Sequence, residues 1–144
     1  MNNMRQKDSG AEGQEAQIAR ILVVEDNYDA ATILETLLRI KGYDVCVTQR
    51  GLQGVAAGLT YRPHIAIVDL GLPDIDGWEV ARRLRDGLGN SRPVLIALTG
   101  YGSDEHRAKS TSAGFDHHLL KSMASDELLN LIRQAANSKT GSRQ

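Results

Sequence analysis

The stretch 65-IAIVDLGLPDIDGWEV-80 decides the fold of this chain of 144 residues. It opens on a short aliphatic run, which is typical of a strand buried on both faces of a parallel sheet. Asp69 follows that run directly, and a turn between Pro73 and Gly77 leads into a helical pattern. A carboxylate at the end of a buried strand suggests that this end of the strand carries a functional group.

Further aliphatic runs alternate with helical patterns along the chain. The predicted strands are 21-ILVV-24, 43-YDVCVT-48, 65-IAIV-68, 94-VLIAL-98 and 118-HLL-120. The strict alternation of strand and helix predicts an α/β fold with a doubly wound, five-stranded parallel sheet.

Two helices are predicted from apolar periodicity. Residues 29–41 form the first, and Gly42 supplies its stop. Its predicted apolar face consists of Ile33, Leu34, Leu37 and Leu38. Residues 77–88 form the second, because small and aliphatic side chains recur there on one face.

The other helices have weaker signals. Ser103 and Ser125 are each followed by two acidic residues, which predicts that each serine caps the N-terminus of a helix. Residues 52–61 give the weakest helix prediction, because Gly54 and Gly58 interrupt the pattern.

Length and composition predict one domain between two short tails. Residues 18–137 form the domain, whereas residues 1–17 and 138–144 lack a periodic apolar face and are predicted to be a disordered N-terminal tail and a flexible C-terminal tail. The lone cysteine, Cys46, lies in an apolar strand and is predicted to be a packed thiol.

The charges argue against two classes of partner. The formal net charge is -1, from 17 basic and 18 acidic residues spread along the chain, so no basic field predicts direct nucleic-acid binding. No aliphatic run approaches the ~20 residues of a membrane helix, and no signal peptide is evident. We therefore expect a cytoplasmic protein without a membrane partner.

Polar residues follow the strongest strands at once. They are Glu25, Asp26, Asp69, Thr99 and Lys121. The carboxyl ends of parallel strands lie along one edge of a sheet, so these side chains are expected to converge there. Crowded carboxylates favour a hard divalent cation such as Mg²⁺, and an aspartate can itself attack a phosphoryl group.

A structural alternative exists for each acid taken alone. Asp26 or Asp29 could be a helix cap, and only the joint placement of polar residues at four strand ends favours a site. Asp74 and Asp76 lie in the turn before a helix, and Asp76 is interpreted as a cap or turn former.

Four segments together resemble a response-regulator receiver domain, the phosphoacceptor half of two-component signalling. They are 22-LVVEDN-27, 67-IVDLGLPDIDG-77, 96-IALTG-100 and the lysine of 114-GFDHHLLK-121. The resemblance implies a flavodoxin-like sheet with strand order 2-1-3-4-5, flanked by five helices.

The resemblance also implies the chemistry of the site. Asp69 would be the phosphorylated residue, and the ligands of Mg²⁺, or of Mn²⁺ in its place, would be Asp26, Asp69 and the Gly71 carbonyl. Glu25 would act through metal-bound water. Thr99 and Lys121 would hold the phosphoryl oxygens.

The partners implied are those of a phosphorelay. The donor would be a sensor histidine kinase or a histidine phosphotransfer protein, with small acyl phosphates as substitutes. The chain would act as a single-domain switch rather than a turnover enzyme, and would signal to an unknown protein target. As a hypothesis, a movement of Thr99 would pass through residues 99–105 to the next helix, an output surface shared with the last strand and helix.

The sequence departs from the family pattern at two positions. Ser122 follows Lys121 where the family usually has proline, so the Lys121–Ser122 peptide is left open between cis and trans. His118 replaces the usual tyrosine or phenylalanine, and is either a switch residue or an ordinary edge-strand histidine. The other three histidines are predicted to be solvated, without zinc-ligand spacing: His64, His106 and His117.

Two other functions remain open at this point. The missing proline favours a phosphorylation-independent pseudo-receiver that works as a docking module, although the complete set of acids opposes it. A phosphatase with an aspartyl nucleophile would generally need a second aspartate two positions after Asp69, where this chain has Gly71.

Overall fold

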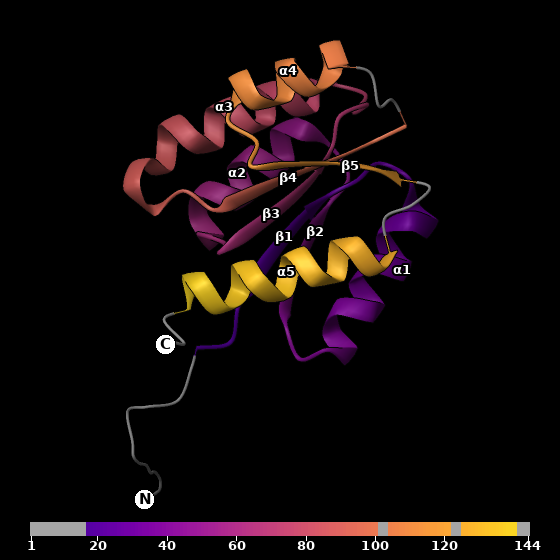
Figure 1. The fold of residues 1–144 in the computed structure, drawn as a ribbon, viewed down its shortest axis with the longest axis vertical. Coiled ribbons are helices and arrows are strands. Elements are labelled where there is room, and N and C mark those ends of the chain that lie inside the picture. Colours follow the sequence, from indigo (N-terminus) through magenta and orange to yellow (C-terminus); the bar gives the residue numbers. More distant parts are fainter. Residues whose placement is uncertain (1–16, 101–103, 122–124, 141–144) are drawn as a thin grey trace, which may run out of the picture.

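The computed structural model describes residues 17–100, 104–121 and 125–140. A parallel sheet of five strands in the order β2-β1-β3-β4-β5 forms the centre of the described chain (Figure 1). The strands are β1 (Arg20–Val24), β2 (Asp44–Thr48), β3 (Ile65–Asp69), β4 (Val94–Thr99) and β5 (His117–Leu120). The predicted fold class and strand order are confirmed.

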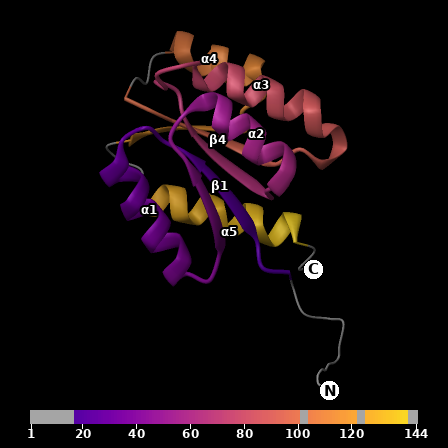
Figure 2. The same ribbon diagram turned by 180° about the vertical axis from the view of Figure 1, so that it is seen from behind.

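Helices cover both faces of the sheet. One face carries α1 (Tyr28–Ile40) and α5 (Ser125–Lys139), and the other carries α2 (Gly51–Tyr61), α3 (Gly77–Leu88) and α4 (Asp104–Ala113) (Figures 1 and 2). A short 3-10 turn, Gly89–Ser91, leads from α3 to β4. This arrangement leaves the carboxyl ends of the strands open between the helix layers.

The core has two halves, one on each face of the sheet. Alternate residues of the strands enter them: Val23 and Ile67 pack toward α1 and α5, whereas Leu22 and Val68 pack toward α2 and α3. The strands read as continuous aliphatic runs because both of their faces are buried. Cys46 is half-buried against the second half of the core, and burial raises the pKa of its thiol, as expected for a packed cysteine.

The glycines of α2 explain why this helix forms although its helix propensity is low. Gly54 and Gly58 are buried. A Cβ atom at Gly54 would lie 2.7 Å from Val24 Cγ2, and one at Gly58 would collide with Leu84. The two glycines therefore let α2 pack closely on β1 and α3, and tertiary contact overrides the propensity that made this helix the weakest prediction.

The helix ends confirm one predicted cap and replace another. Asp76 caps α3, because its carboxylate accepts a hydrogen bond of 2.9 Å from the Glu79 amide. At α1 the cap is Asn27, whose side chain accepts from the Ala30 amide at 2.8 Å, so neither Asp26 nor Asp29 caps that helix. Gly42 has a φ of +95° and ends α1 as predicted.

The two predicted serine caps, Ser103 and Ser125, lie outside the described residues and side chains.

The final helix is longer than predicted. Helix α5 continues through Ser138 and Lys139, into the segment 138–144 that was assigned to the tail, and Lys139 Nζ donates to the Arg92 carbonyl at 2.8 Å.

Four side chains lie in environments that differ from those predicted. Ile33 is 68% exposed, although it was placed on the apolar face of the first helix. His64 is buried rather than solvated, because its Nδ1 accepts a hydrogen bond of 2.8 Å from the Arg20 amide and its pKa is lowered, first by burial and then by nearby Arg20. His106 is half-buried and stacks on Trp78, and His117 is half-buried on β5.

Candidate functional site

Three carboxylates meet at the carboxyl ends of β1 and β3. Glu25 and Asp26 follow β1 directly and Asp69 is the last residue of β3, so the neighbouring strands bring them to one edge of the sheet. One oxygen of each carboxylate lies within 4.8 Å of the others. Glu25 and Asp69 are buried and Asp26 is exposed, so the cluster is half enclosed and open to solvent on one side.

Lys121 completes this group from the end of β5. Its Nζ lies 3.0 Å from Glu25 Oε1 and 3.1 Å from Asp69 Oδ2. Partial burial acts to lower the pKa of the ammonium, but the carboxylates of Glu25 and Asp69 outweigh it and raise that pKa above its ordinary value. Lys121 is therefore held in its charged form beside Asp69.

The cluster keeps an excess of negative charge. Burial raises the pKa of Glu25, and the neighbouring charge of Asp69 adds to this, although the Asn27 amide and Lys121 both stabilise the ionised form. One ammonium faces three carboxylates, so a further cation would lower the electrostatic repulsion.

The donor atoms of the cluster suit a hard cation. Within the described residues, the group contains carboxylate oxygens and neither imidazole nor thiolate. Mg²⁺ prefers oxygen ligands and usually takes only one or two carboxylates while it keeps several waters, so the residues present fit it, and Mn²⁺ has a similar preference.

The loop after β3 is fixed by hydrogen bonds that also orient Asp69. The Gly71 amide donates to Asp69 Oδ1 at 3.1 Å, whereas Lys121 contacts the other oxygen, Oδ2. Gly77 begins α3 so close to the strand end that an added Cβ would lie 2.6 Å from the Asp69 carbonyl oxygen. The role of the Gly71 carbonyl as a ligand stays a prediction.

Asp74 has a role that the sequence analysis missed. Its two carboxylate oxygens accept hydrogen bonds of 2.8 Å each from the amides of Gly51 and Leu52, at the start of α2. The bonds from Leu52 and Gly51 lower the pKa of this exposed carboxyl to about 2. Asp74 thus ties the loop that follows Asp69 to the N-terminus of α2, where the helix dipole also favours an anion.

Thr99 and His118 lie on the next two strands. Thr99 ends β4, is 2% exposed and pairs with Leu120 of β5. His118 is half-buried on β5, and its Nδ1 lies 2.9 Å from the Ser110 hydroxyl of α4. Ser110 was not among the residues that the sequence predicted to be functional. The Lys121–Ser122 peptide lies outside the described residues.

An apolar pocket opens beside the acidic cluster. It has a volume of about 280 Å³ and reaches from Asp69 and Lys121 into the space between α1 and α5. Its walls include Ile33, Leu34, Leu37, Leu128 and Leu129. Ile33, a residue of the predicted apolar face, lines this pocket and is exposed.

The sequence pattern of the response regulator receiver domain matches residues 21–133. The chain therefore belongs to this family, a class of phosphoacceptor modules in two-component signalling. Among its relatives are a probable transcriptional regulatory protein, SilR of Salmonella typhimurium, and CusR of Escherichia coli K12, with 38% and 35% identity over 114 residues, or 79% of this chain. The match covers 49% of each relative, so the chain spans about half their length.

Solved structures agree with this assignment. A CheY-like receiver domain protein from Methanospirillum hungatei matches 88% of this chain and 100% of its own, with 26% identity and a TM-score of 0.79. The receiver domain of a sensor histidine kinase from Pseudomonas aeruginosa, solved with magnesium coordinated in its active site cleft, matches 84% of this chain and 99% of its own, with 30% identity and a TM-score of 0.75.

Proposed function

We propose that this domain accepts a phosphoryl group on Asp69 and acts as a switch in two-component signalling. The observation that carries the proposal is the position of the Lys121 ammonium, 3.1 Å from the Asp69 carboxylate, in the same cluster as Glu25 and Asp26. A nucleophilic carboxylate, a fixed cation and an open acidic rim are what transfer of a phosphoryl group to aspartate requires.

In the proposed reaction, a carboxylate oxygen of Asp69 attacks the phosphorus atom in line with the leaving group. A P–O bond to Asp69 forms while the bond from phosphorus to the donor's imidazole nitrogen, or to the oxygen of an acyl phosphate, breaks, and the leaving group departs with the bonding electron pair. Lys121 neutralises the phosphoryl oxygens, and the Thr99 hydroxyl donates to one of them.

Mg²⁺ fits the same residues. Asp26, Asp69 and the Gly71 carbonyl would hold the ion, with Glu25 acting through water, and the bound ion would supply positive charge to the phosphoryl oxygens. The three carboxylates of the cluster, with a single ammonium beside them, support this assignment.

The surroundings of Asp69 support a protein as the phosphoryl donor. Tyr28 and Ile33 on α1 are 69% and 68% exposed, and Ile33 lines the pocket beside the site. A sensor kinase or phosphotransfer protein that brings a phosphohistidine to Asp69 must cover this surface, and burial of its apolar side chains would contribute to docking.

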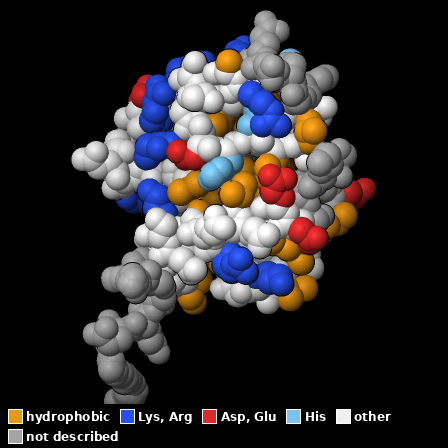
Figure 3. All heavy atoms as spheres, in the orientation of Figure 1, with side chains coloured by type: hydrophobic (Ala, Val, Ile, Leu, Met, Phe, Trp, Pro, Cys, Tyr) orange, Lys and Arg blue, Asp and Glu red, His pale blue; other side chains and the backbone are white. Residues whose placement is uncertain are grey.

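The output is proposed to be a protein contact. On the face shown in Figure 3, basic, acidic, histidine and apolar side chains are mixed, so no single sign of charge dominates that face. This supports a protein target more than a nucleic acid. None of the helices in the described part of the chain has the length and apolar character needed to span a bilayer.

Incubation with acetyl phosphate and Mg²⁺, followed by intact mass measurement, tests the proposal. We expect the mass to increase by one phosphoryl group, and we expect the increase to be lost in Asp69→Asn and with a chelator. Asp86→Asn, a change at an exposed acid on α3, serves as the matched control and should leave the gain intact. No gain in the wild-type protein would favour the phosphorylation-independent docking module instead.

A further inference from the structure

Helix α4 lacks an apolar face like the one that anchors α3. Among its described side chains, residues 106–113, only Ser110 and Ala113 are buried. By contrast, α3 buries three large aliphatic side chains, Val80, Leu84 and Leu88. Because α4 has so little apolar surface to bury, directional polar contacts must fix its position on the domain.

The central polar contact is the buried hydroxyl of Ser110. Trp78 Nε1 of α3 donates to Ser110 Oγ at 2.9 Å, and His118 Nδ1 of β5 lies 2.9 Å from the same oxygen. Ser110 is 1% exposed, so its hydroxyl is shielded from solvent. One oxygen atom therefore joins three elements, α3, α4 and β5.

The chemistry of the three groups sets the direction of these hydrogen bonds. An indole N–H can only donate, so Ser110 Oγ accepts from Trp78 and keeps its own hydrogen to donate. His118 Nδ1 can accept that hydrogen when the imidazole is neutral and carries its proton on Nε2. The series of hydrogen bonds then runs from Trp78 to Ser110 to His118, and consecutive hydrogen bonds of this kind polarise one another.

Further contacts hold Trp78 and His118, the two outer members of this hydrogen-bond series, against α4. Lys109 Nζ lies 4.1 Å from the centroid of the Trp78 ring, and the His106 ring stacks on Trp78 with centroids 5.8 Å apart. At the other end, Arg107 donates to the His118 carbonyl at 3.4 Å. A movement of the His118 ring therefore affects the Ser110 hydroxyl and, through it, the hydrogen bond from Trp78.

We propose that Ser110 is a positioning residue that couples His118 on β5 to Trp78 on α3, so that the state of the β5 side chain is transmitted to the α3–α4 surface. The coupling itself does not depend on phosphorylation. Its use as an output of Asp69 rests on the proposed function.

The coupling can be measured without phosphorylation, by NMR of the Trp78 indole N–H in the full chain. Trp78 is the only tryptophan, so its indole signal is unambiguous. We expect His118→Phe, which removes the ring nitrogen, to shift this signal in the wild-type background but not in a Ser110→Ala background. We also expect Ser110→Ala to speed exchange of the indole hydrogen with solvent by on the order of ten-fold, because a buried donor loses its acceptor.

Matched variants separate coupling from a general disturbance. Ser112→Ala lies two positions away on the exposed face of α4, and in this background His118→Phe should shift the indole signal as in the wild type. Ser110→Thr keeps the hydroxyl and should keep the coupling, which also provides a test if Ser110→Ala does not fold. An equal shift in the Ser110→Ala background, or no shift in the wild type, would overturn the proposal.

A second arm asks whether the site at Asp69 uses this coupling. Beryllofluoride with Mg²⁺ mimics a phosphorylated aspartate, and we expect it to change the Trp78 fluorescence of the wild type and of Ser112→Ala but not of Ser110→Ala. Fluorine NMR of the bound beryllofluoride reports loading separately. Failure to load contradicts the proposed function, whereas loading with an equal fluorescence change in Ser110→Ala contradicts the use of Ser110 in the output.

Discussion

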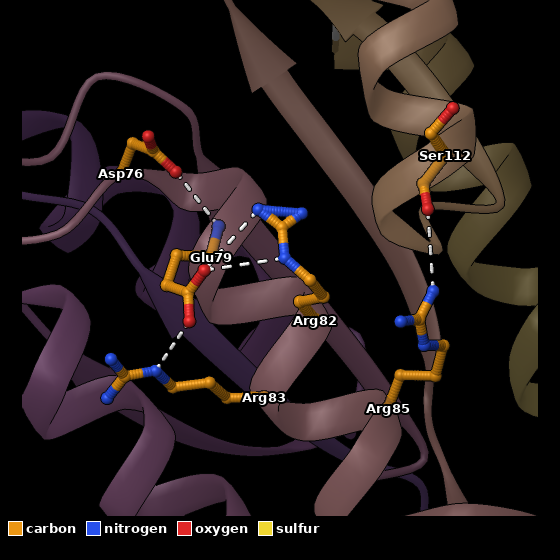
Figure 4. A network of polar contacts seen from close by, with 6 residues as sticks. All are labelled: Asp76, Glu79, Arg82, Arg83, Arg85 and Ser112. Carbon is orange, nitrogen blue, oxygen red and sulfur yellow. Dashed lines mark hydrogen bonds and ion pairs between the residues drawn. The ribbon is translucent and has the colours of Figure 1, made fainter.

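Helices α3 and α4 lie side by side on the same face of the sheet, yet they are held by different forces (Figure 1). Helix α3 begins at a carboxylate cap, approaches β3 closely at Gly77 and buries an aliphatic stripe. Helix α4 is held through Ser110, through side chains around Trp78 and through Arg85, which donates to the Ser112 carbonyl at 3.4 Å (Figure 4).

This difference separates a fixed part of the domain from an adjustable one. Apolar packing is strong and has little directional preference, so α3 and β3 hold Asp69 in one place. Hydrogen bonds contribute little net stability but depend strongly on geometry, so α4 can exchange one set of partners for another at small cost. The acidic cluster thus lies beside the fixed part, at the ends of β1 and β3. The adjustable part, α4, packs against β5, at the edge of the sheet.

The largest expected effect tests the packing of α3. Leu84→Ala should lower the free energy of unfolding by about 2–5 kcal/mol, because Leu84 is fully buried and its truncation leaves a cavity against α2 and β1. Urea denaturation measures this. Leu52→Ala, at a residue that is 51% exposed on α2, is the matched control and should change stability by less than about 0.5 kcal/mol. Equal losses in the two variants would mean that α3 is not held by its apolar stripe.

A smaller effect is expected at the cap of α3. Asp76→Ala should cost about 1 kcal/mol, because the Glu79 amide loses its acceptor. Asp86→Ala near the other end of the helix removes a carboxylate where the helix dipole does not favour one, and should not destabilise. Urea denaturation of both variants provides the comparison, and an equal loss in Asp86→Ala would contradict the capping role.

Asp74 ties the β3–α3 loop to α2 by two hydrogen bonds, and these predict an effect on stability that appears only at acidic pH. The pKa of Asp74 is about 2 in the folded protein and 3.8 ordinarily, so its contribution to stability is present above pH 3.8 and is lost as the pH falls toward 2. Asp74→Asn should remove this part of the acid sensitivity, whereas Asp86→Asn should not. Free energies of unfolding measured across this pH range test the prediction. Parallel pH curves for the wild type and Asp74→Asn would contradict the stabilising role of the Asp74 carboxylate.

The smallest effect is expected at the exposed ion pairs of α3. Glu79 pairs with Arg83 at 2.8 Å and with Arg82 at 3.3 Å (Figure 4). Solvent screens such pairs, so Glu79→Gln should destabilise less than Asp76→Ala, and added salt should reduce the difference from wild type further. Thermal unfolding at low and high salt checks this, and a loss that persists in high salt would point to a role other than the ion pairs.

The sequence was enough to predict the sheet and the residues of the acidic cluster. Aliphatic strands and the polar residue after each of them are local signals, and the rule that parallel strands end along one edge turns these signals into a shared site. Glu25, Asp26, Asp69 and Lys121 meet as expected. The ligand role of Gly71 and the phosphoryl contact of Thr99 stay predictions.

Other features depended on partners distant in the sequence. Asp74 binds amides 22 and 23 positions away, and Trp78 binds a serine 32 positions away. Ser110 carried no sequence signal, because a serine in a polar helix is usually solvated. His64 was predicted to be solvated because its acceptor role toward Arg20 appears only once β1 and β3 are paired.

The carboxylate at the end of β3, held beside Lys121, is the proposed phosphoryl acceptor. The most direct measurement treats the phosphorylated protein with borohydride, which reduces an aspartyl phosphate to homoserine, and locates the new residue by peptide mass spectrometry. We expect homoserine at position 69 in the phosphorylated wild-type protein, and none in a sample that was not phosphorylated or that contained a chelator. Homoserine at another aspartate, with position 69 intact, would contradict it.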